Sequence, residues 1–476
     1  MMKIKRKFTH TSIQKNRIKF KMSVLKSINP ATEELFAEFK EMDLSTTEEI
    51  IVKSAKSQIS WSDVDIEKRS KIILKIGSLL TKNKDSYANI ITNEMGKPIT
   101  ESIAEIEKCI WLCEYYAENA NKFLSDQYID SDAQKSLVAF EPLGVILGVM
   151  PWNFPFWQVF RFAVPAILVG NAVLLKHASN VQASAIAIEK IFHKSDLPND
   201  VFRTLIIGSG IVSDIIANKH VKAVSLTGSE YAGSKVGECS GKHLKKTVLE
   251  LGGADPFIVL EDADLPKCID SAVKGRMLNN GQSCIAAKRF IVHSSVYDKF
   301  ILGLKKSIEK LSIGDPMIDE TQIGPLARED ILNEVDEQVQ RSVKLGATLI
   351  SGGARLDKPG YFYSPTILTD ITKDMPVYYD ETFGPVFTIF KFDSIDEMIE
   401  IANDSDFGLG GSLWSNDREK ALSLARKIET GAVFINDFTK SDPRLPFGGI
   451  KKSGYGRELS EFGIREFVNI KTISIN

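Results

Sequence analysis

Between residues 142 and 252, short apolar runs alternate with stretches whose apolar residues recur every three or four positions. Runs of the first kind predict β-strands, and stretches of the second kind predict amphipathic helices. The predicted strands are Gly144–Met150, Ala172–Lys176, Val201–Ile207 and Val221–Leu226. Helices are expected at Phe156–Leu168 and Gln182–Phe192. This alternation is typical of a doubly wound α/β domain.

A second α/β pattern runs from about residue 253 to residue 434. Its predicted strands are Pro256–Leu260, Arg289–His293, Ala347–Ile350 and Val386–Lys391. The helices expected between them are Ala263–Met277, Ser295–Leu311, Asp330–Leu345 and Arg418–Ile428. Amphipathic stretches from Thr46 to roughly Lys122 predict helices before both patterns. Because the 476 residues exceed the roughly 250–300 of a single core, we expect two large domains.

Two β-segments lie outside these patterns, at Ser136–Glu141 and Phe467–Ile475. The C-terminal segment is predicted to be an exposed strand, and an exposed edge of this kind is best satisfied by pairing. We therefore expect a small β arm, formed by residues 123–141 and 458–476, through which the chain assembles as a homodimer or homotetramer. The sequence leaves the choice between these two states open.

The composition is that of an ordinary globular protein, with 43% hydrophobic residues and a formal net charge of −2. A balance this close to neutral gives no reason to expect nucleic acid or an anionic membrane as a partner. The longest apolar stretch, Phe162–Leu175, is broken by Pro165 and Gly170 and is shorter than the ~18 residues of a spanning helix. We therefore expect a soluble protein.

Five scattered cysteines are too few, and odd in number, for a disulfide framework, which favours a reducing compartment such as the cytoplasm. Cys109 and Cys113 are four residues apart in a helical pattern, so they form either a metal half-site or two partly buried core thiols. No second pair follows, and the six histidines show no ligand spacing. We predict no metal.

Residues 1–22 differ from the rest because eight of them are Lys or Arg and none is acidic. Three interpretations remain open: a disordered basic tail, an organelle-targeting presequence, or translation that starts at Met22. Globular patterning begins abruptly at Ser23, which favours the third. Secretion is not expected, because no apolar segment follows the charges.

The segment Asn279–Arg289 contains the first candidate for chemistry, the nucleophile Cys284. Small and amide residues precede this cysteine and the cations Lys288 and Arg289 follow it, which suits a reactive thiol. A structural role is the alternative for a lone cysteine. Catalysis would need a base and an oxyanion donor from elsewhere in the chain.

Glu250 and Asn153 are the candidates for the base and the oxyanion donor. Glu250 is flanked by leucines, so desolvation would raise its pKa toward the range of a general base. The alternative is a salt-bridged acid at a strand end. Asn153 follows a predicted strand in a loop made rigid by two prolines, where its amide would donate to an oxyanion. The alternative is an ordinary turn residue.

Predicted strands end in small residues and open into helices at Gly208-Ser209-Gly210 and at Thr227-Gly228-Ser229. Such turns place backbone N–H groups at helix N-termini, where phosphate binds. Gly208 and Ser229 are therefore cofactor-binding candidates. A complete G-x-G-x-x-G fingerprint is absent, so plain connections are the alternative.

The segments described so far resemble the NAD(P)-dependent aldehyde dehydrogenase superfamily, and the resemblance extends from Met22 to Asn476. It rests also on Asp380–Val386, on Pro446–Gly454 and on the 34 residues that separate base from nucleophile. It implies a Rossmann-like cofactor domain (residues 23–122 and 142–252), an α/β catalytic domain (253–457) and the β arm.

The resemblance implies a role for each candidate. Cys284 would attack the aldehyde carbon, Asn153 and the Cys284 backbone N–H would hold the oxyanion, and Glu250 would activate the water that hydrolyses the thioester. Hydride would pass to nicotinamide. The implied cofactor contacts are Trp152 and Ser229 near the pyrophosphate, Glu381 at the nicotinamide ribose and Phe383 beside the ring.

The segment Leu175–Asn180 bears on the choice of cofactor. Many NAD-preferring members carry a glutamate where this chain has Ser179, and that acid repels a 2′-phosphate. Lys176 and Ser179 would instead receive the phosphate by charge and hydrogen bond. We predict that NADP is preferred, with use of both NADP and NAD as the alternative.

Parts of the pattern are similar to bacterial-type succinate-semialdehyde dehydrogenases, which implies oxidation of succinate semialdehyde to succinate. Arg161 matches an arginine that grips the substrate carboxylate, and Ser441 matches its hydroxyl partner. A solvated salt bridge on the helix surface is the alternative for Arg161. Many members have a second arginine where this chain has Leu278. A broad-range aldehyde dehydrogenase and, more remotely, a non-catalytic member of the fold therefore remain open.

Overall fold

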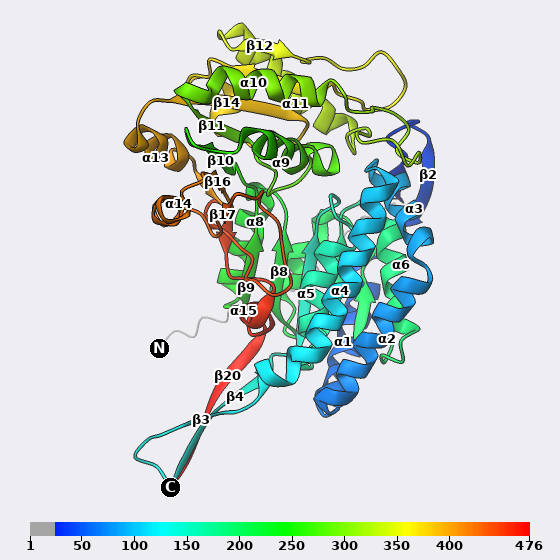
Figure 1. Cartoon of the computed structure of the whole chain (residues 1–476). Coiled ribbons are helices and arrows are strands. Elements are labelled where there is room, and N and C mark those ends of the chain that lie inside the picture. Colours follow the sequence, from blue (N-terminus) through cyan, green and yellow to red (C-terminus); the bar gives the residue numbers. More distant parts are fainter. Residues whose placement is uncertain (1–23) are drawn as a thin grey trace, which may run out of the picture.

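The computed structural model describes residues 24–476, which form two helix-flanked sheets and a projecting β arm (Figure 1). One sheet lies in the upper lobe of the figure and the other in the lower lobe, and the arm extends below. The α/β class predicted from the sequence is confirmed. The predictions for residues 1–22 concern a segment outside the described residues.

The sheet of the lower lobe has the strand order β19-β9-β8-β5-β6-β7. Its strands are β5 (Val145–Met150), β6 (Ala172–His177), β7 (Phe202–Thr204), β8 (Val221–Thr227), β9 (Lys246–Glu250) and β19 (Gly454–Tyr455). β5 pairs in parallel with both β6 and β8. The chain adds β6 and β7 on one side of β5 and then β8 and β9 on the other, so the strand order reverses at β5. Ligands of doubly wound sheets bind at the carboxyl ends of the strands beside such a reversal.

Helices pack on this sheet, and the central one, α5, is buried at every position. A helix that is buried on all sides needs a partner on each face, and α5 lies between the sheet and the long helix α4. Trp61 Nε1 also donates a hydrogen bond to the Ile167 carbonyl of α5 at 2.9 Å. The helices are α1 (Leu44–Ser62), α2 (Ile66–Lys82), α3 (Lys84–Met95), α4 (Ile99–Leu124), α5 (Trp157–Val169), α6 (Gln182–His193), α7 (Val212–Ala217) and α8 (Glu230–Lys242).

The sheet of the upper lobe has the order β12-β13-β14-β11-β10-β16-β17. Its strands are β10 (Pro256–Val259), β11 (Arg289–His293), β12 (Thr348–Ser351), β13 (Thr366–Thr369), β14 (Val386–Phe392), β16 (Ser412–Trp414) and β17 (Phe434–Ile435). Its main helices are α9 (Leu265–Met277), α10 (Ser294–Ile308), α11 (Glu329–Lys344), α13 (Ile395–Asn403) and α14 (Arg418–Ala425). The prediction for β11 is confirmed at both ends. β13 and β16 were missed because such short runs carry little periodicity, whereas α13 was missed although its apolar residues recur with helical spacing.

The arm consists of β20 (Val468–Ile475), β4 (Lys135–Pro142) and β3 (Gln127–Ile129), paired antiparallel in that order. Every residue of β20 after Val468 is exposed, including Ile470, Ile473 and Ile475. The outer edge of β20 has no partner strand within the described range. The assignment of this arm to oligomerisation, and the domain boundaries given above, stay predictions.

Gly148 of β5 lies against Phe162 of α5, where a β-carbon would be 2.1 Å from the ring atom Cζ. We expect Gly148→Ala to lower the free energy of unfolding by about 1–3 kcal/mol, because the closely packed ring has no free space to enter. Gly241→Ala in α8 is the matched control, since nothing lies within 4 Å of its added carbon. That change should be neutral or stabilising. Thermal unfolding measures both, and equal midpoints would contradict the expectation.

Candidate active site

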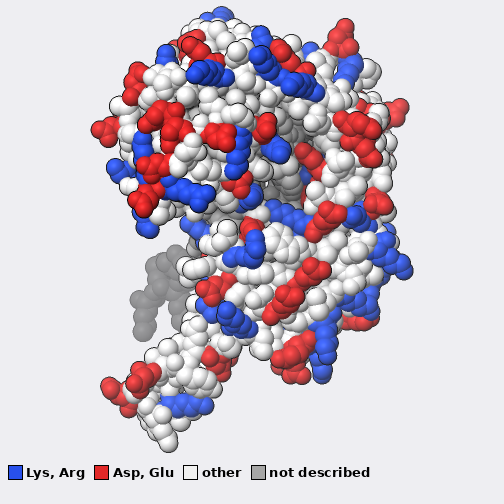
Figure 2. Space-filling model, in the orientation of Figure 1, with Lys and Arg blue, Asp and Glu red and all other residues white. Residues whose placement is uncertain are grey.

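A cleft between the two lobes and a smaller cavity beside it meet at Cys284. The cleft has a volume of about 580 Å³ and the cavity about 160 Å³. The space-filling surface is hollowed between the lobes, and acidic and basic side chains are interspersed around it (Figure 2). Within the described chain, Cys284 is the one residue that lines both spaces.

A left-handed turn precedes the cysteine. Asn279, Asn280 and Gly281 all have positive φ, of 55°, 57° and 80°. Glycine and asparagine tolerate this conformation best, which explains the Asn-Asn-Gly sequence. Asn279 Nδ2 also donates to the Asn153 carbonyl oxygen at 2.8 Å. The turn therefore ties the loop of Cys284 to the end of β5.

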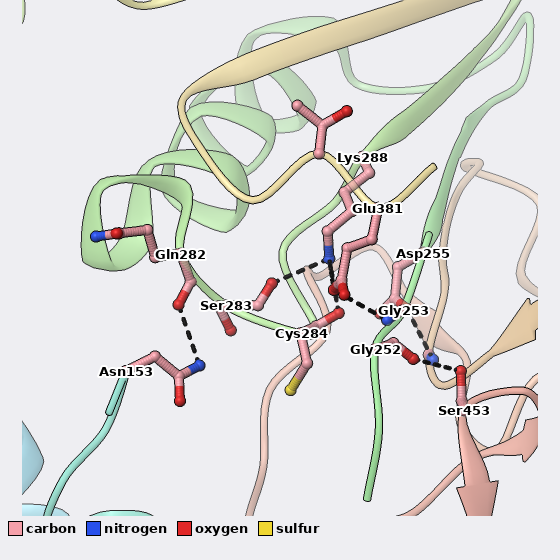
Figure 3. A network of polar contacts seen from close by, with 12 residues as sticks. Asn153, Gly252, Gly253, Asp255, Gln282, Ser283, Cys284, Lys288, Glu381 and Ser453 are labelled. Carbon is pink, nitrogen blue, oxygen red and sulfur yellow. Dashed lines mark hydrogen bonds and ion pairs between the residues drawn. The ribbon is translucent and has the colours of Figure 1, made fainter. Parts of the chain in front are cut away.

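Asn153 lies beside Cys284 on the loop that follows β5 (Figure 3). Its Nδ2 donates to the Gln282 carbonyl oxygen at 3.1 Å, which leaves its second N–H for a ligand. The same loop is held by His177, whose Nε2 lies 2.9 Å from the Pro155 carbonyl oxygen. Burial lowers the pKa of His177 to about 4, so this ring stays neutral near pH 7. The amide is thus placed to meet negative charge on an oxygen near the sulfur.

Lys288 joins the loop of Cys284 to Glu381 (Figure 3). Its Nζ donates to the carbonyl oxygens of Ser283 and Cys284 at 3.0 and 2.8 Å and lies 3.1 Å from Glu381 Oε1. Burial raises the pKa of the Cys284 thiol to about 12, whereas the charges of Arg161 and Lys288 lower it. The half-buried thiol is therefore protonated at neutral pH, and these two cations favour its thiolate.

Glu250 ends β9 and is buried, but it lines neither the cleft nor the cavity. Neither of its carboxyl oxygens has a hydrogen-bond partner among residues 24–476, which does not fit the alternative of a salt-bridged acid. Burial and, second, the Glu458 carboxylate raise the pKa of Glu250 well above its usual range, against the charges of Arg161 and Arg457. A carboxylate in this setting has a strong affinity for a proton.

Arg161 of α5 is paired with Glu458 inside the protein. The two side chains form an ion pair, and the Arg161 guanidinium lies 4.6 Å from the Phe447 ring centroid. Arg161 is only 2% exposed, so the alternative of a solvated surface salt bridge is wrong. It lines the cavity together with Ser441. Glu458 was missed because nothing in its local sequence distinguishes it from a surface acid.

Ser441 and Lys108 meet in the wall of the cavity. Lys108 Nζ donates to Ser441 Oγ at 2.7 Å. Lys108 was not a candidate, since a lysine in an amphipathic helix usually extends into solvent. Leu278 lines the same cavity and adds no charge.

Four of the predicted cofactor-binding residues line the cleft: Trp152, Ser229, Glu381 and Phe383. The rings of Trp152 and Phe383 meet edge to face with centroids 5.7 Å apart. Ser229 is the N-cap of α8, and its Oγ accepts from the Ala232 N–H at 3.3 Å. The N-terminus of α8 therefore opens at the cleft, where remaining N–H groups can bind an anion.

Lys176, Ser179 and Gly208 are not among the residues that line the cleft. Ser179 is exposed on the loop after β6, whereas Lys176 is buried at the end of that strand. Burial lowers the pKa of Lys176, and the nearby Glu41 carboxylate opposes this shift. A β-carbon at Gly208 would lie 2.9 Å from Glu41 Oε1. Lys176 and Gly208 therefore both lie near Glu41. The local sequence around Glu41 gives no sign of this, so sequence analysis missed it.

Within residues 24–476, no group of three or more His, Cys, Asp or Glu side chains is placed to hold a metal ion. Cys109 and Cys113 are both buried in the core, where burial raises their pKa values. This setting fits core thiols rather than a metal half-site. Over the same range, no helix combines the length and apolarity needed to cross a membrane.

The chain is similar to known proteins over nearly its whole length. The model of the aldehyde dehydrogenase family matches residues 19–473. A probable NADP(+) succinate-semialdehyde dehydrogenase of Synechocystis is 48% identical over 449 residues, 94% of this chain and 99% of the relative. The NADP(+) succinate-semialdehyde dehydrogenase 1 of Mycobacterium tuberculosis is 46% identical over 452 residues, with the same coverage. The crystal structure of succinic semialdehyde dehydrogenase from Streptococcus pyogenes, in complex with NADP+, has a TM-score of 0.93 at 41% identity and covers 95% of this chain and 99% of that chain.

Replacement of Lys288 tests whether its charge favours the Cys284 thiolate. In Lys288→Met the pKa of the thiol should rise, so alkylation of Cys284 by iodoacetamide at mildly alkaline pH should slow by about 10-fold. Lys274→Met, an exposed lysine of α9, is the control and should leave the rate unchanged. Peptide mass spectrometry separates Cys284 from the half-buried Cys239. Equal rates in the wild type and in Lys288→Met would contradict this role.

Proposed function

Because the chain belongs to the aldehyde dehydrogenase family, we propose that it oxidises succinate semialdehyde to succinate with NADP⁺. The observation that carries the proposal is the position of Cys284, which borders both the cleft and the cavity. The cleft suits a dinucleotide, and the cavity offers Arg161 and Ser441 to a carboxylate. The relatives from Synechocystis and M. tuberculosis carry this activity and cofactor in their names.

Cys284 is the nucleophile of the proposed reaction. The thiol loses its proton to solvent water, and the thiolate adds to the aldehyde carbon. The oxygen that becomes negative accepts hydrogen bonds from Asn153 Nδ2 and the Cys284 backbone N–H. NADP⁺, when bound, accepts the hydride that leaves this carbon, and the adduct on Cys284 becomes a thioester. Arg161 and Lys288 favour the first step because they lower the pKa of the thiol.

Glu250 is the base of the second half of the reaction. It takes a proton from a water molecule that attacks the thioester carbonyl, the carboxylic acid departs and the thiol of Cys284 is restored. A carboxylate whose pKa is raised by burial is a stronger base than one in water, and Glu250 has such a pKa. Since Glu250 does not line the cleft, its side chain must turn toward Cys284 for this step.

The cofactor contacts follow the cleft from the nicotinamide end to the adenosine end. Glu381 would bind the nicotinamide ribose, Phe383 would pack beside the ring, and Trp152 and Ser229 would contact the pyrophosphate, where the N-terminus of α8 would add N–H donors. Lys176 and Ser179, which lie beyond Gly208, would receive the 2′-phosphate. The Glu41 carboxylate shares the charge of Lys176, so we expect a preference for NADP over NAD and not an absolute requirement.

A broader range of aldehydes is the second candidate function. Much of the cavity wall is apolar, since Leu278, Phe154, Trp157 and Phe447 all contribute to it. Such a wall suits neutral aliphatic and aromatic aldehydes. The two candidates differ in whether a carboxylate on the substrate raises or lowers kcat/KM.

Steady-state rates with succinate semialdehyde, glutarate semialdehyde, hexanal and benzaldehyde, each with NADP and NAD, test the proposal. We expect the highest kcat/KM for succinate semialdehyde with NADP, because cations in an apolar wall favour a carboxylate strongly. A higher kcat/KM for hexanal would instead establish the broad range. A rate with NAD and none with NADP would overturn the cofactor assignment.

Glu250→Gln separates the two halves of the reaction. We expect steady-state turnover to fall by about 100- to 10,000-fold, because water is no longer deprotonated. The first turnover should persist, giving a burst of NADPH close to one per active site and a thioester on Cys284 visible by mass spectrometry. Glu48→Gln, an exposed acid of α1, should turn over normally. Loss of the burst along with turnover would show that Glu250 acts before the thioester forms.

A further inference from the structure

The cavity beside Cys284 contains a lysine that the mechanism above does not need. Lys108 comes from α4 (Ile99–Leu124), and its Nζ reaches Ser441 Oγ at 2.7 Å. The same ammonium lies 4.4 Å from the ring centroid of Trp157. Lys108, Ser441 and Cys284 all line one cavity, so a small molecule held there contacts the cation and the nucleophile together.

The charge of Lys108 is not balanced by an acid of its own. Arg161 in the same wall is paired with Glu458, and Lys440 lies 2.5 Å from Asp437. No ion pair joins Lys108 to a carboxylate of the described chain, and its polar contact there is the neutral hydroxyl of Ser441. A partly buried cation that is paired only with a hydroxyl favours an anion strongly.

The acids in the cavity wall are engaged elsewhere. Glu105 accepts hydrogen bonds from the backbone N–H groups of Phe156 and Trp157 and forms an ion pair with Lys97. Glu101 accepts one from the Asn279 N–H at 2.7 Å. These acids fix the loops around the cavity and leave Lys108 for a ligand.

We propose that Lys108, together with Ser441, binds the carboxylate of the substrate and so selects a short semialdehyde acid over an uncharged aldehyde. This inference rests on the proposed function and adds a specificity-determining residue to it. Arg161, already neutralised by Glu458, then contributes mainly to the charge balance near Cys284 and Glu250. The hydroxyl and the ammonium together supply two donors to the two oxygens of one carboxylate.

The surroundings of Lys108 also predict a pH dependence. Burial and, second, the charge of Arg161 lower the pKa of Lys108 to about 8, against the opposing effects of Cys109, Asp442 and Glu105. A lysine loses its charge as the pH rises through its pKa. The KM for a semialdehyde acid should therefore rise above about pH 8 in the wild type, and that rise should be absent in Lys108→Met.

Lys108→Met and Lys108→Arg, assayed with succinate semialdehyde and with butanal, test the proposal. We expect Lys108→Met to lower kcat/KM for succinate semialdehyde by about 10- to 100-fold, mainly through KM, as for loss of a charge-assisted hydrogen bond. Butanal should be affected far less, and Lys108→Arg should recover most of the loss. Lys122→Met, an exposed lysine near the end of the same helix, is the matched control and should match the wild type on both substrates.

A second comparison separates direct binding from an effect through Ser441. In a Ser441→Ala background, Lys108→Met should still reduce kcat/KM for succinate semialdehyde; if it has no further effect, Lys108 acts only through Ser441 and the inference fails. Equal losses on both substrates would likewise overturn it. If the wild type does not prefer succinate semialdehyde to butanal, the proposed function itself fails. If Lys108→Met keeps the full wild-type ratio of kcat/KM between succinate semialdehyde and butanal, only the role of Lys108 is overturned.

Discussion

The buried ammonium of Lys288 is the interaction on which the rest of the site depends. A charge withdrawn from water is tolerated only when it is fully compensated, and Lys288 is compensated by two main-chain carbonyls and the Glu381 carboxylate. The carbonyls belong to the loop of Cys284, and the carboxylate belongs to the wall of the cleft. The Lys288 charge therefore positions both the loop of Cys284 and the Glu381 wall of the cleft. If either moved away, a buried polar group would lose its partner.

A second balance of charge lies on the other side of the sulfur. Arg161 lies near two buried carboxyl groups, those of Glu458 and Glu250. Because its ion pair is with Glu458, a negative charge on Glu250 is only weakly compensated. The high proton affinity of Glu250 therefore comes from its buried surroundings rather than from its chemical type. Burial also raises the pKa of the Cys284 thiol, and the charges of Arg161 and Lys288 oppose that shift and favour the thiolate.

The parts of this protein that could be predicted from the sequence are those with a local physical signal. The centre of β11 is an apolar run of three residues, Phe290, Ile291 and Val292, and the Asn-Asn-Gly turn and the two-proline loop restrict the backbone near Cys284 and Asn153. Lys108 could not be found in this way, because it meets Ser441 across 333 positions of sequence and an amphipathic helix looks the same whether its lysine is solvated or enclosed. Glu41 and Glu458 were missed for the same reason, and β13 and β16 because three or four residues do not define a period.

The cleft and the cavity have only Cys284 in common among the described residues that line them. A nucleotide in the cleft and an aldehyde in the cavity would therefore meet at Cys284. A single inhibitor that fills both spaces would have to pass Cys284, so the proposed nucleophile is also the residue at which the two halves of the site join.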